Sequence, residues 1–161
     1  MNQTTLRFAT PQDMPAVLEL VRELAHYEKA PQEVTVTVDE LIEDGFTRNL
    51  FTCIVAEIQK EIVGMAFYYP RYSTWKGRTI HLEDFIVKEA FRGRGIGQLL
   101  FDKVVAESKK FGAKRLEWHV LDWNEPAINF YKKINANLDG EWMLGKLTEE
   151  QLDNWEIQLD N

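Results

Sequence analysis

A glycine-rich turn between a strand and a helix places the strongest constraint on how this chain folds. Residues 81–87 read His-Leu-Glu-Asp-Phe-Ile-Val, an apolar run with two carboxylates that is typical of a strand. Residues 91–100 follow as Phe-Arg-Gly-Arg-Gly-Ile-Gly-Gln-Leu-Leu. Glycines at alternate positions allow a sharp turn with bare N–H groups, and the helix start adds unpaired N–H groups and a positive dipole end. This geometry favours binding of a phosphate or pyrophosphate.

The spacing within the turn narrows the class of phosphate binder. A P-loop ends in Gly-Lys-Ser/Thr, but Gln98 and Leu99 follow Gly97, so the lysine and the magnesium-binding hydroxyl are missing. A dinucleotide fingerprint that began at Gly93 would need a glycine where Gln98 stands. What remains is the pattern Arg-x-x-Gly-x-Gly at residues 92–97, for which a plain tight turn is the alternative.

The composition predicts a single domain, residues 1–161, with one sizeable core. The 161 residues are 45% hydrophobic and 28% charged, as in globular domains. Residues 1–7 lack the pattern of a signal peptide, and no run of about 18 apolar residues suggests a membrane span. We therefore expect a cytoplasmic protein without a membrane partner.

The charge and the few cysteines and histidines limit the chemistry. A formal net charge of −7 disfavours nucleic acid and anionic membranes and mildly favours a cationic partner. The single cysteine, Cys53, lies in an apolar run, which predicts a buried thiol more than a nucleophile. His26, His81 and His119 show no metal-ligand spacing, so we expect no metal.

Periodicity and capping signals predict an α/β chain. After an initial strand, Thr10 and Pro11 begin a helix that reaches about Glu28, and a capping box at residues 37–40 begins a second helix. The later expected elements are strands at 52–58 and 62–69, a loop, a strand at 79–87, a helix at 96–111 closed by Gly112, a strand at 114–121, a helix from Asn124 to a left-handed cap at Asn135, a strand near 138–144 and an amphipathic piece from Thr148.

This order and the pattern at residues 92–97 resemble the GCN5-related N-acetyltransferases. Within them, several segments are similar to the diamine acetyltransferases, which include the spermidine/spermine acetyltransferases and thialysine-acetylating relatives. The segments are residues 23–28, 43–46, 72–80, 82–85 and 121–126. The similarity runs from about Leu6 to Trp142, and residues 72–80 and 121–124 lean towards the thialysine-type branch. The resemblance implies a central mixed, mostly antiparallel twisted sheet flanked by helices.

The resemblance also implies direct transfer of an acetyl group from acetyl-coenzyme A to a primary amine of a small diamine, polyamine or lysine-like amino acid. It assigns the cofactor-binding role to these residues: Phe85, Ile86 and Val87 for the pantetheine arm; Arg92, Gly93, Arg94, Gly95, Ile96, Gly97 and Gln98 for the pyrophosphate; and Asn124 with Tyr131 at the far wall. Tyr131 matches the family tyrosine that protonates the departing thiolate, which suits a phenol with a pKa of about 10. Packing beside Phe130 is the alternative for Tyr131.

The two adjacent carboxylates of the strand pose a problem of direction. In a regular pleat Glu83 and Asp84 point to opposite faces and cannot both meet one substrate. The resemblance places Glu83 near the amine, where it acts through water, and leaves Asp84 as a second substrate contact or a structural residue. For both carboxylates, an ion pair with Arg78 or Arg115 is the alternative.

A lysine-like substrate needs two kinds of contact. Its ammonium has a pKa of about 10.4, so deprotonation at pH 7 costs about 4–5 kcal/mol, and a nearby carboxylate stabilises the charged form further. We therefore expect Tyr27 and Glu28 to bind the ammonium or the polyamine tail while Glu83 orders the water that accepts the proton. A solvated helix end is the alternative for Tyr27 and Glu28. His119 either lines the substrate cleft or packs as an ordinary side chain.

Some alternatives stay open at the level of sequence. Either Asp139 or Glu141 matches the family's acid before Trp142, and this bears on how a distal amine is recognised. An acetyl-coenzyme A-binding sensor and a protein-lysine acetyltransferase are alternative functions. The relatives are usually homodimers, and the aromatic segment around Trp142 and Trp155 is a candidate interface.

Overall fold

A sheet with its strands in sequence order forms the centre of the first of two compact units, Met1–Leu121 and Asp122–Asn161. The structure, a computed structural model, describes residues 3–157, and among them the sheet has five strands. They are β1 (Thr5–Phe8), β2 (Thr52–Ile58), β3 (Glu61–Ser73), β4 (Gly77–Val87) and β5 (Arg115–Glu117). The pairs from β1 to β4 are antiparallel and β5 runs parallel to β4. The expected mixed, mostly antiparallel sheet is confirmed.

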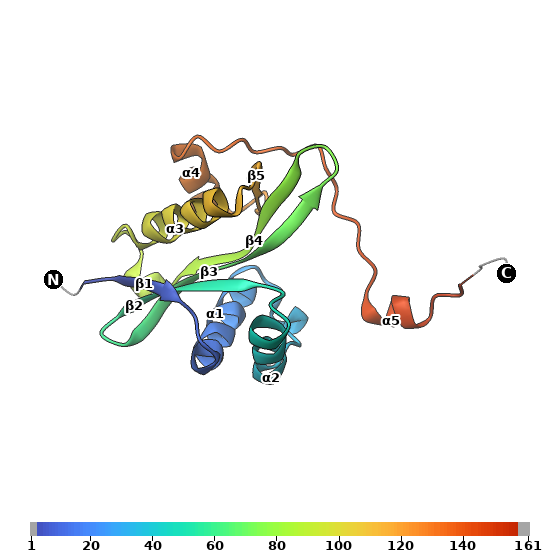
Figure 1. The fold of residues 1–161 in the computed structure, drawn as a ribbon, viewed down its shortest axis with the longest axis horizontal. Helices are drawn as coiled ribbons and strands as arrows, with labels where there is room; N and C mark the ends of the chain where they lie inside the picture. The colour runs from blue at the N-terminus through green and yellow to red at the C-terminus, as the bar shows by residue number, and fades with distance from the viewer. Residues whose placement is uncertain (1–2, 158–161) are drawn as a thin grey trace. The chain divides into compact units, whose positions relative to one another are not determined.

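Helices cover both faces of this sheet, as Figure 1 shows for the first unit. The helices α1 (Met14–Tyr27) and α2 (Val38–Ile42) lie on one face, and α3 (Ile96–Phe111) lies on the other. Three short 3₁₀ turns, at Pro11–Asp13, Pro31–Glu33 and Glu89–Phe91, and a π-helical turn at Glu43–Thr47 connect these elements.

The core under α1 holds the sheet and the first two helices together. Each fully buried aliphatic side chain in such a core stabilises the fold by about 1.5–3 kcal/mol. Its buried members are Met14, Val17, Leu18, Leu20, Leu41, Cys53, Val55, Ile62, Met65 and Ile86. On the other face α3 packs closely, because a Cβ added at Gly64 would lie 2.8 Å from the carbonyl oxygen of Ile86 and 3.3 Å from Leu100.

The structure confirms the predicted helix caps, which depend on residues close together in the chain. Thr37 and Glu40 form the expected capping box, with Glu40 N donating to Thr37 Oγ1 at 3.2 Å. Gly112 ends α3 in the left-handed conformation, with φ at 74°. In the second unit Asn124 caps α4 (Glu125–Lys133), Asn135 has a φ of 58°, and Thr148 caps α5 (Glu149–Asp153).

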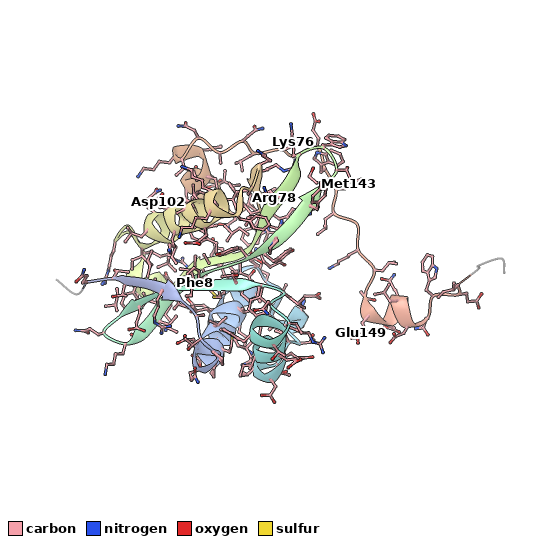
Figure 2. All side chains as sticks on the ribbon, in the orientation of Figure 1. Phe8, Lys76, Arg78, Asp102, Met143 and Glu149 are labelled. Atoms are coloured by element: carbon pink, nitrogen blue, oxygen red, sulfur yellow. The ribbon has the colours of Figure 1, made fainter. Side chains whose placement is uncertain are left out.

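Three expected strands differ in length or are missing. The loop predicted around residues 72–77 is shorter than expected, because β3 continues to Ser73 and β4 begins at Gly77, which leaves a turn at residues 74–76. Figure 2 shows Lys76 at the tip of this long hairpin. β5 covers only part of the predicted 114–121. The strand expected near 138–144 does not form, and these residues carry no regular secondary structure.

The longest helix of the described residues is α3, and none of the helices within 3–157 combines the length and the apolar character that a membrane crossing requires.

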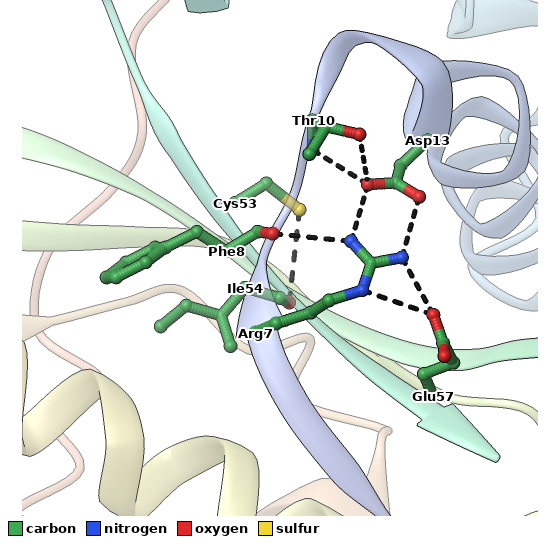
Figure 3. A network of polar contacts seen from close by, with 7 residues as sticks. All are labelled: Arg7, Phe8, Thr10, Asp13, Cys53, Ile54 and Glu57. Atoms are coloured by element: carbon green, nitrogen blue, oxygen red, sulfur yellow. Dashed lines mark hydrogen bonds and ion pairs between the residues drawn. The ribbon is translucent and has the colours of Figure 1, made fainter. Parts of the chain in front are cut away.

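An arginine-centred network ties the beginning of the chain to the sheet (Figure 3). The guanidinium of Arg7 donates to both oxygens of Asp13, at 2.7 and 2.9 Å, and to Glu57 Oε2 at 2.8 and 3.1 Å. Asp13 also accepts hydrogen bonds from Thr10, so the network joins β1, the turn before α1, and β2. The Arg7 guanidinium holds the pKa of Asp13 far below its usual value.

We expect Arg7→Leu to lower the free energy of unfolding by about 1–3 kcal/mol at pH 7, because two partly buried carboxylates lose their charged donor. The pKa of Asp13 is depressed in the folded state, so this contribution is present above its unfolded pKa and is lost as the pH falls below about 4. Urea unfolding at pH 7 and pH 3 measures both effects. Arg48→Leu, which removes an exposed pair with Glu43, is the control and changes stability by less than about 0.5 kcal/mol. Equal effects of the two substitutions would contradict the structural role of Arg7.

Candidate functional site

The glycine turn has the backbone conformation that the sequence predicts. Gly93 and Gly95 have φ angles of 73° and 79°, and Gly95 is the N-cap of the sixteen-residue helix α3. A Cβ at either glycine would meet no atom within 4 Å, so the left-handed backbone is what favours glycine here. The first helical hydrogen bond runs from Leu99 N to Gly95 O at 3.1 Å, which leaves the N–H groups of residues 96–98 at the open helix end.

Two arginine side chains bind back onto the chain before the turn and fix its shape. Arg92 Nε donates to Val87 O at 2.9 Å, and Arg94 Nη2 donates to Ala90 O at 3.0 Å. The guanidinium of Arg92 also lies over the ring of Tyr27, 5.8 Å from its centroid. The glycine turn and the end of α1 therefore lie next to each other, although 64 residues separate Tyr27 from Phe91.

Near the glycine turn, strand β4 is paired with β3 along one edge, whereas β5 does not reach this far along the other edge. Phe85, Ile86 and Val87 pair with Ala66, Met65 and Gly64 of β3. β5 pairs with β4 only from Thr79 to His81 and does not extend along residues 85–87. The segment predicted to bind a pantetheine arm is thus bounded by a strand on one edge only within the first unit.

A β-bulge changes the direction of the two adjacent carboxylates. Phe67 pairs with Asp84 and Tyr68 pairs with Leu82, so Glu83 is an extra residue on β4. Glu83 Oε2 accepts a hydrogen bond of 2.8 Å from Tyr69 OH, and Tyr69 faces the same side of the sheet as Phe67. Glu83 and Asp84 therefore share one face. The expected alternation of this pair is wrong, because it assumed a regular pleat.

Three carboxylates influence one another at this place. Burial is the main cause that raises the pKa of Asp84 to about 6, and the charges of Glu83 and Glu28 raise it further. Burial also raises the pKa of Glu28, which follows the last residue of α1. Carboxylates that repel one another in this way are typical of sites that receive a cation.

The alternative of an ion pair between Glu83 or Asp84 and either Arg78 or Arg115 is not found among the described residues. Arg115 Nε lies 2.8 Å from Glu117 Oε2, on its own strand. The guanidinium of Arg78 lies over the ring of Phe111, 5.7 Å from its centroid. Both arginines are therefore engaged elsewhere.

Two side chains near Glu83 were not predicted from the sequence. His81 Nε2 lies 3.4 Å from Glu83 Oε2, and the ring of His81 lies between those of Tyr69, at 5.3 Å, and His119, at 5.2 Å. His119 therefore packs against His81, and its role in lining a substrate cleft stays a prediction. Tyr69 and His81 are direct neighbours across β3 and β4, a pairing that depends on the register past the bulge and leaves no local signal.

The remaining predicted residues belong to the second unit. Asn124 Oδ1 accepts the N–H of Ala127 at 3.4 Å and so begins α4. Tyr131 is buried on α4, and its ring meets that of Phe130 edge-on at 5.5 Å. Asp139 binds Glu141 N at 2.9 Å and Trp142 Nε1 at 3.1 Å, whereas the side chain of Glu141 is exposed.

Within residues 3–157, neither Cys53 nor a group of potential metal ligands forms a second candidate site. Cys53 is buried under α1, and burial raises the pKa of its thiol to about 12, which keeps it protonated. No three His, Cys, Asp or Glu side chains of this part of the chain are arranged to hold a metal ion.

Comparisons with known proteins agree with this geometry. Residues 15–136 match the model of the family described as "Acetyltransferase (GNAT) family". The chain is 41% identical over 140 residues to the thialysine N-epsilon-acetyltransferase of Bos taurus, covering 81% of this chain and 82% of that protein. It is 33% identical over 163 residues to the human spermidine/spermine N(1)-acetyltransferase-like protein 1, covering 94% of this chain but 24% of that longer protein. Among solved structures, an integron cassette protein of V. cholerae superposes with a TM-score of 0.75 at 20% identity, covering 93% of this chain and 95% of that one.

We expect Asp84→Asn to raise the free energy of unfolding by about 1–3 kcal/mol at pH 7.5 and to leave it almost unchanged at pH 4. Burial raises the pKa of Asp84 from its usual value of about 3.8 to about 6 in the folded protein, so its ionisation opposes folding as the pH rises through this window. Urea unfolding at the two pH values is the measurement, and the same change at exposed Asp153 is the control. A stabilisation that is equal at both pH values would contradict the raised pKa.

Proposed function

This chain belongs to the acetyltransferase (GNAT) family of acyltransferases, and we propose that it transfers an acetyl group from acetyl-coenzyme A to a primary amine of a small cationic molecule. The observation that carries this proposal is the cluster of Glu28, Glu83 and Asp84 in the unit that also holds the glycine turn. A pyrophosphate suits the turn, and an ammonium suits the carboxylates.

The turn supports the coenzyme part of the proposal. The open N–H groups of Ile96, Gly97 and Gln98 and the left-handed Gly93 and Gly95 form a backbone surface for a pyrophosphate. We assign Arg92 and Arg94 mainly to shaping this surface, because both side chains bind carbonyl oxygens of the preceding segment. Phe85, Ile86 and Val87 keep their predicted role towards the pantetheine arm, and Asn124 its role as the far wall.

The carboxylates support the amine part. In the proposed reaction the ammonium, bound by Tyr27, Glu28 and Asp84, first loses one proton through a water ordered by Glu83. The nitrogen then forms a bond to the thioester carbonyl carbon while the carbon–sulfur bond breaks. The leaving thiolate takes the proton of Tyr131, and the second proton released by the nitrogen makes the phenol neutral again, so that one proton is released overall.

The substrate class follows from charge and from the relatives. The bovine relative is named for thialysine and the human relative for spermidine and spermine, which are all small amines. We propose a lysine-like amino acid, a diamine or a polyamine as the acceptor, with thialysine-type molecules as the leading candidates. His119 is proposed to border this acceptor beside His81. We further propose that residues 1–161 form a single domain. We also propose a homodimer that forms through the exposed Trp142 and Trp155, and a cytoplasmic location.

We expect the purified protein to acetylate thialysine, lysine, ornithine, putrescine or spermidine with a kcat/KM at least about tenfold above that for a histone-like peptide, because a peptide lysine side chain offers one ammonium group to three carboxylates, whereas each of the small molecules offers at least two. Release of free thiol from acetyl-coenzyme A measures the rate for each amine. Activity confined to the peptide would replace the proposal with a protein-lysine acetyltransferase. Coenzyme binding without any turnover would indicate a sensor.

We expect Tyr131→Phe to lower kcat by about a hundredfold and to leave the dissociation constant of coenzyme A nearly unchanged, because the variant lacks only the proton donor. Steady-state kinetics and calorimetric titration with coenzyme A separate the two effects. Phe130→Tyr, which changes a neighbouring ring without removing a phenol, is the control. Equal losses of turnover and binding would contradict the assignment of Tyr131.

A further inference from the structure

The carboxylate of Glu83 is contacted on one oxygen only by the described residues. Tyr69 OH donates to Oε2 at 2.8 Å, and His81 Nε2 lies 3.4 Å from the same oxygen. The side chain of Glu83 is half-exposed, whereas that of His81 is 6% exposed. One oxygen is therefore contacted by two side chains of the sheet, while the carboxylate as a whole still reaches the surface.

The buried surroundings of His81 determine which of its two ring nitrogens carries the proton. His81 Nδ1 is buried and has no hydrogen-bond partner, so a proton on Nδ1 would leave an unsatisfied buried donor. The tautomer with the proton on Nε2 instead places that N–H group 3.4 Å from Glu83 Oε2, a polar contact that is longer than an ordinary hydrogen bond.

The surroundings of His81 determine its charge. Tyr69 and Arg71 of β3, Glu83 of β4, Glu117 of β5 and His119 are the titratable groups that influence it. Burial is the largest effect and lowers the pKa of His81, so the ring is neutral at pH 7. A neutral ring leaves the negative charge of Glu83 available for the amine, whereas an imidazolium at this distance would neutralise it.

We propose that Tyr69 and His81 act as positioning residues for Glu83, holding its Oε2 so that Oε1 is presented to the water that takes the proton of the amine. The proposal rests on the proposed function, because it deepens the role of Glu83 in that reaction. We call the pair the Tyr69–His81 clamp. Tyr69 stays a donor throughout the working range, since burial and the bond to Glu83 raise its pKa to about 12.

Substitutions at the clamp separate hydrogen bonding from packing. Tyr69→Phe removes only the hydroxyl. His81→Asn carries its amide nitrogen near the position of Nδ1, whereas His81→Gln carries it near the position of Nε2 and can still donate to Glu83. Tyr72→Phe, at an exposed tyrosine of the hairpin tip, is the matched control for loss of a hydroxyl.

The first measurement does not depend on activity. Carbon NMR of labelled glutamate carboxyl groups follows the titration of Glu83, assigned by comparison with Glu83→Gln, in the full chain. Loss of a donor favours the protonated carboxyl, so we expect the midpoint to move up by about one pH unit in Tyr69→Phe and to move in the same direction in His81→Asn. We expect it to stay in place in His81→Gln and Tyr72→Phe. An unchanged midpoint in both Tyr69→Phe and His81→Asn would overturn the clamp.

The second measurement is kinetic. We expect kcat to fall about ten- to hundredfold in Tyr69→Phe and His81→Asn, with an unchanged KM for acetyl-coenzyme A and an acid limb shifted to higher pH. His81→Gln should recover most of the turnover, and equal losses in His81→Gln and His81→Asn would overturn the donor role of His81. Failure of the proposed function appears differently, as an inactive wild-type protein, and in that case the NMR titration still decides the clamp.

Discussion

One irregularity in hydrogen-bond register, the β-bulge at Glu83, determines the character of the candidate site. Without the extra residue on β4, Glu83 would face α3 while Asp84 faced α1, and the two carboxylates would act in different places. The bulge turns Glu83 onto the face that carries Asp84, Tyr69 and His81. Because β4 continues past the bulge at Glu83 to Val87, the glycine turn keeps its place after the end of the strand.

Repulsion among the carboxylates of the candidate site lowers the stability of the fold, and apolar burial in the neighbouring core compensates for it. Asp84 lies in β4 two residues from each of the buried side chains of Leu82 and Ile86, so its burial is a consequence of the packing that stabilises the sheet. Apolar burial of this kind contributes more than the repulsion among three carboxylates removes. The fold can therefore keep a locally unfavourable arrangement that a bound cation would relieve.

The sequence predicted correctly those features that depend on residues close together in the chain. The caps at Thr37 and Asn124, the left-handed Gly112 and the start of α3 at Ile96 each depend on a few consecutive residues, and all are confirmed. The bulge, the continuation of β3 to Ser73 and the approach of Arg92 to Tyr27 depend on which distant residues pair, and no local pattern encodes them. Tyr69 and His81 escaped prediction for the same reason. The resemblance supplied the roles of Glu83 and Tyr131, but it could not supply their surroundings.

Burial shifts the pKa values of the Asp84 carboxyl group and the His81 imidazole in opposite directions. In the proposed reaction, these shifts connect the charge of the substrate to the release of a proton. Burial raises the pKa of Asp84 and lowers that of His81, so both groups move towards their neutral forms, whereas Glu83 stays half-exposed. A cation that arrives beside Asp84 reverses the first shift, because an opposite charge favours the carboxylate. In the proposed reaction, the binding of an amine near pH 6 would therefore expel a proton from Asp84. The same binding would leave His81 even less prone to accept a proton, so the positive charge of the substrate would itself keep the imidazole neutral next to Glu83.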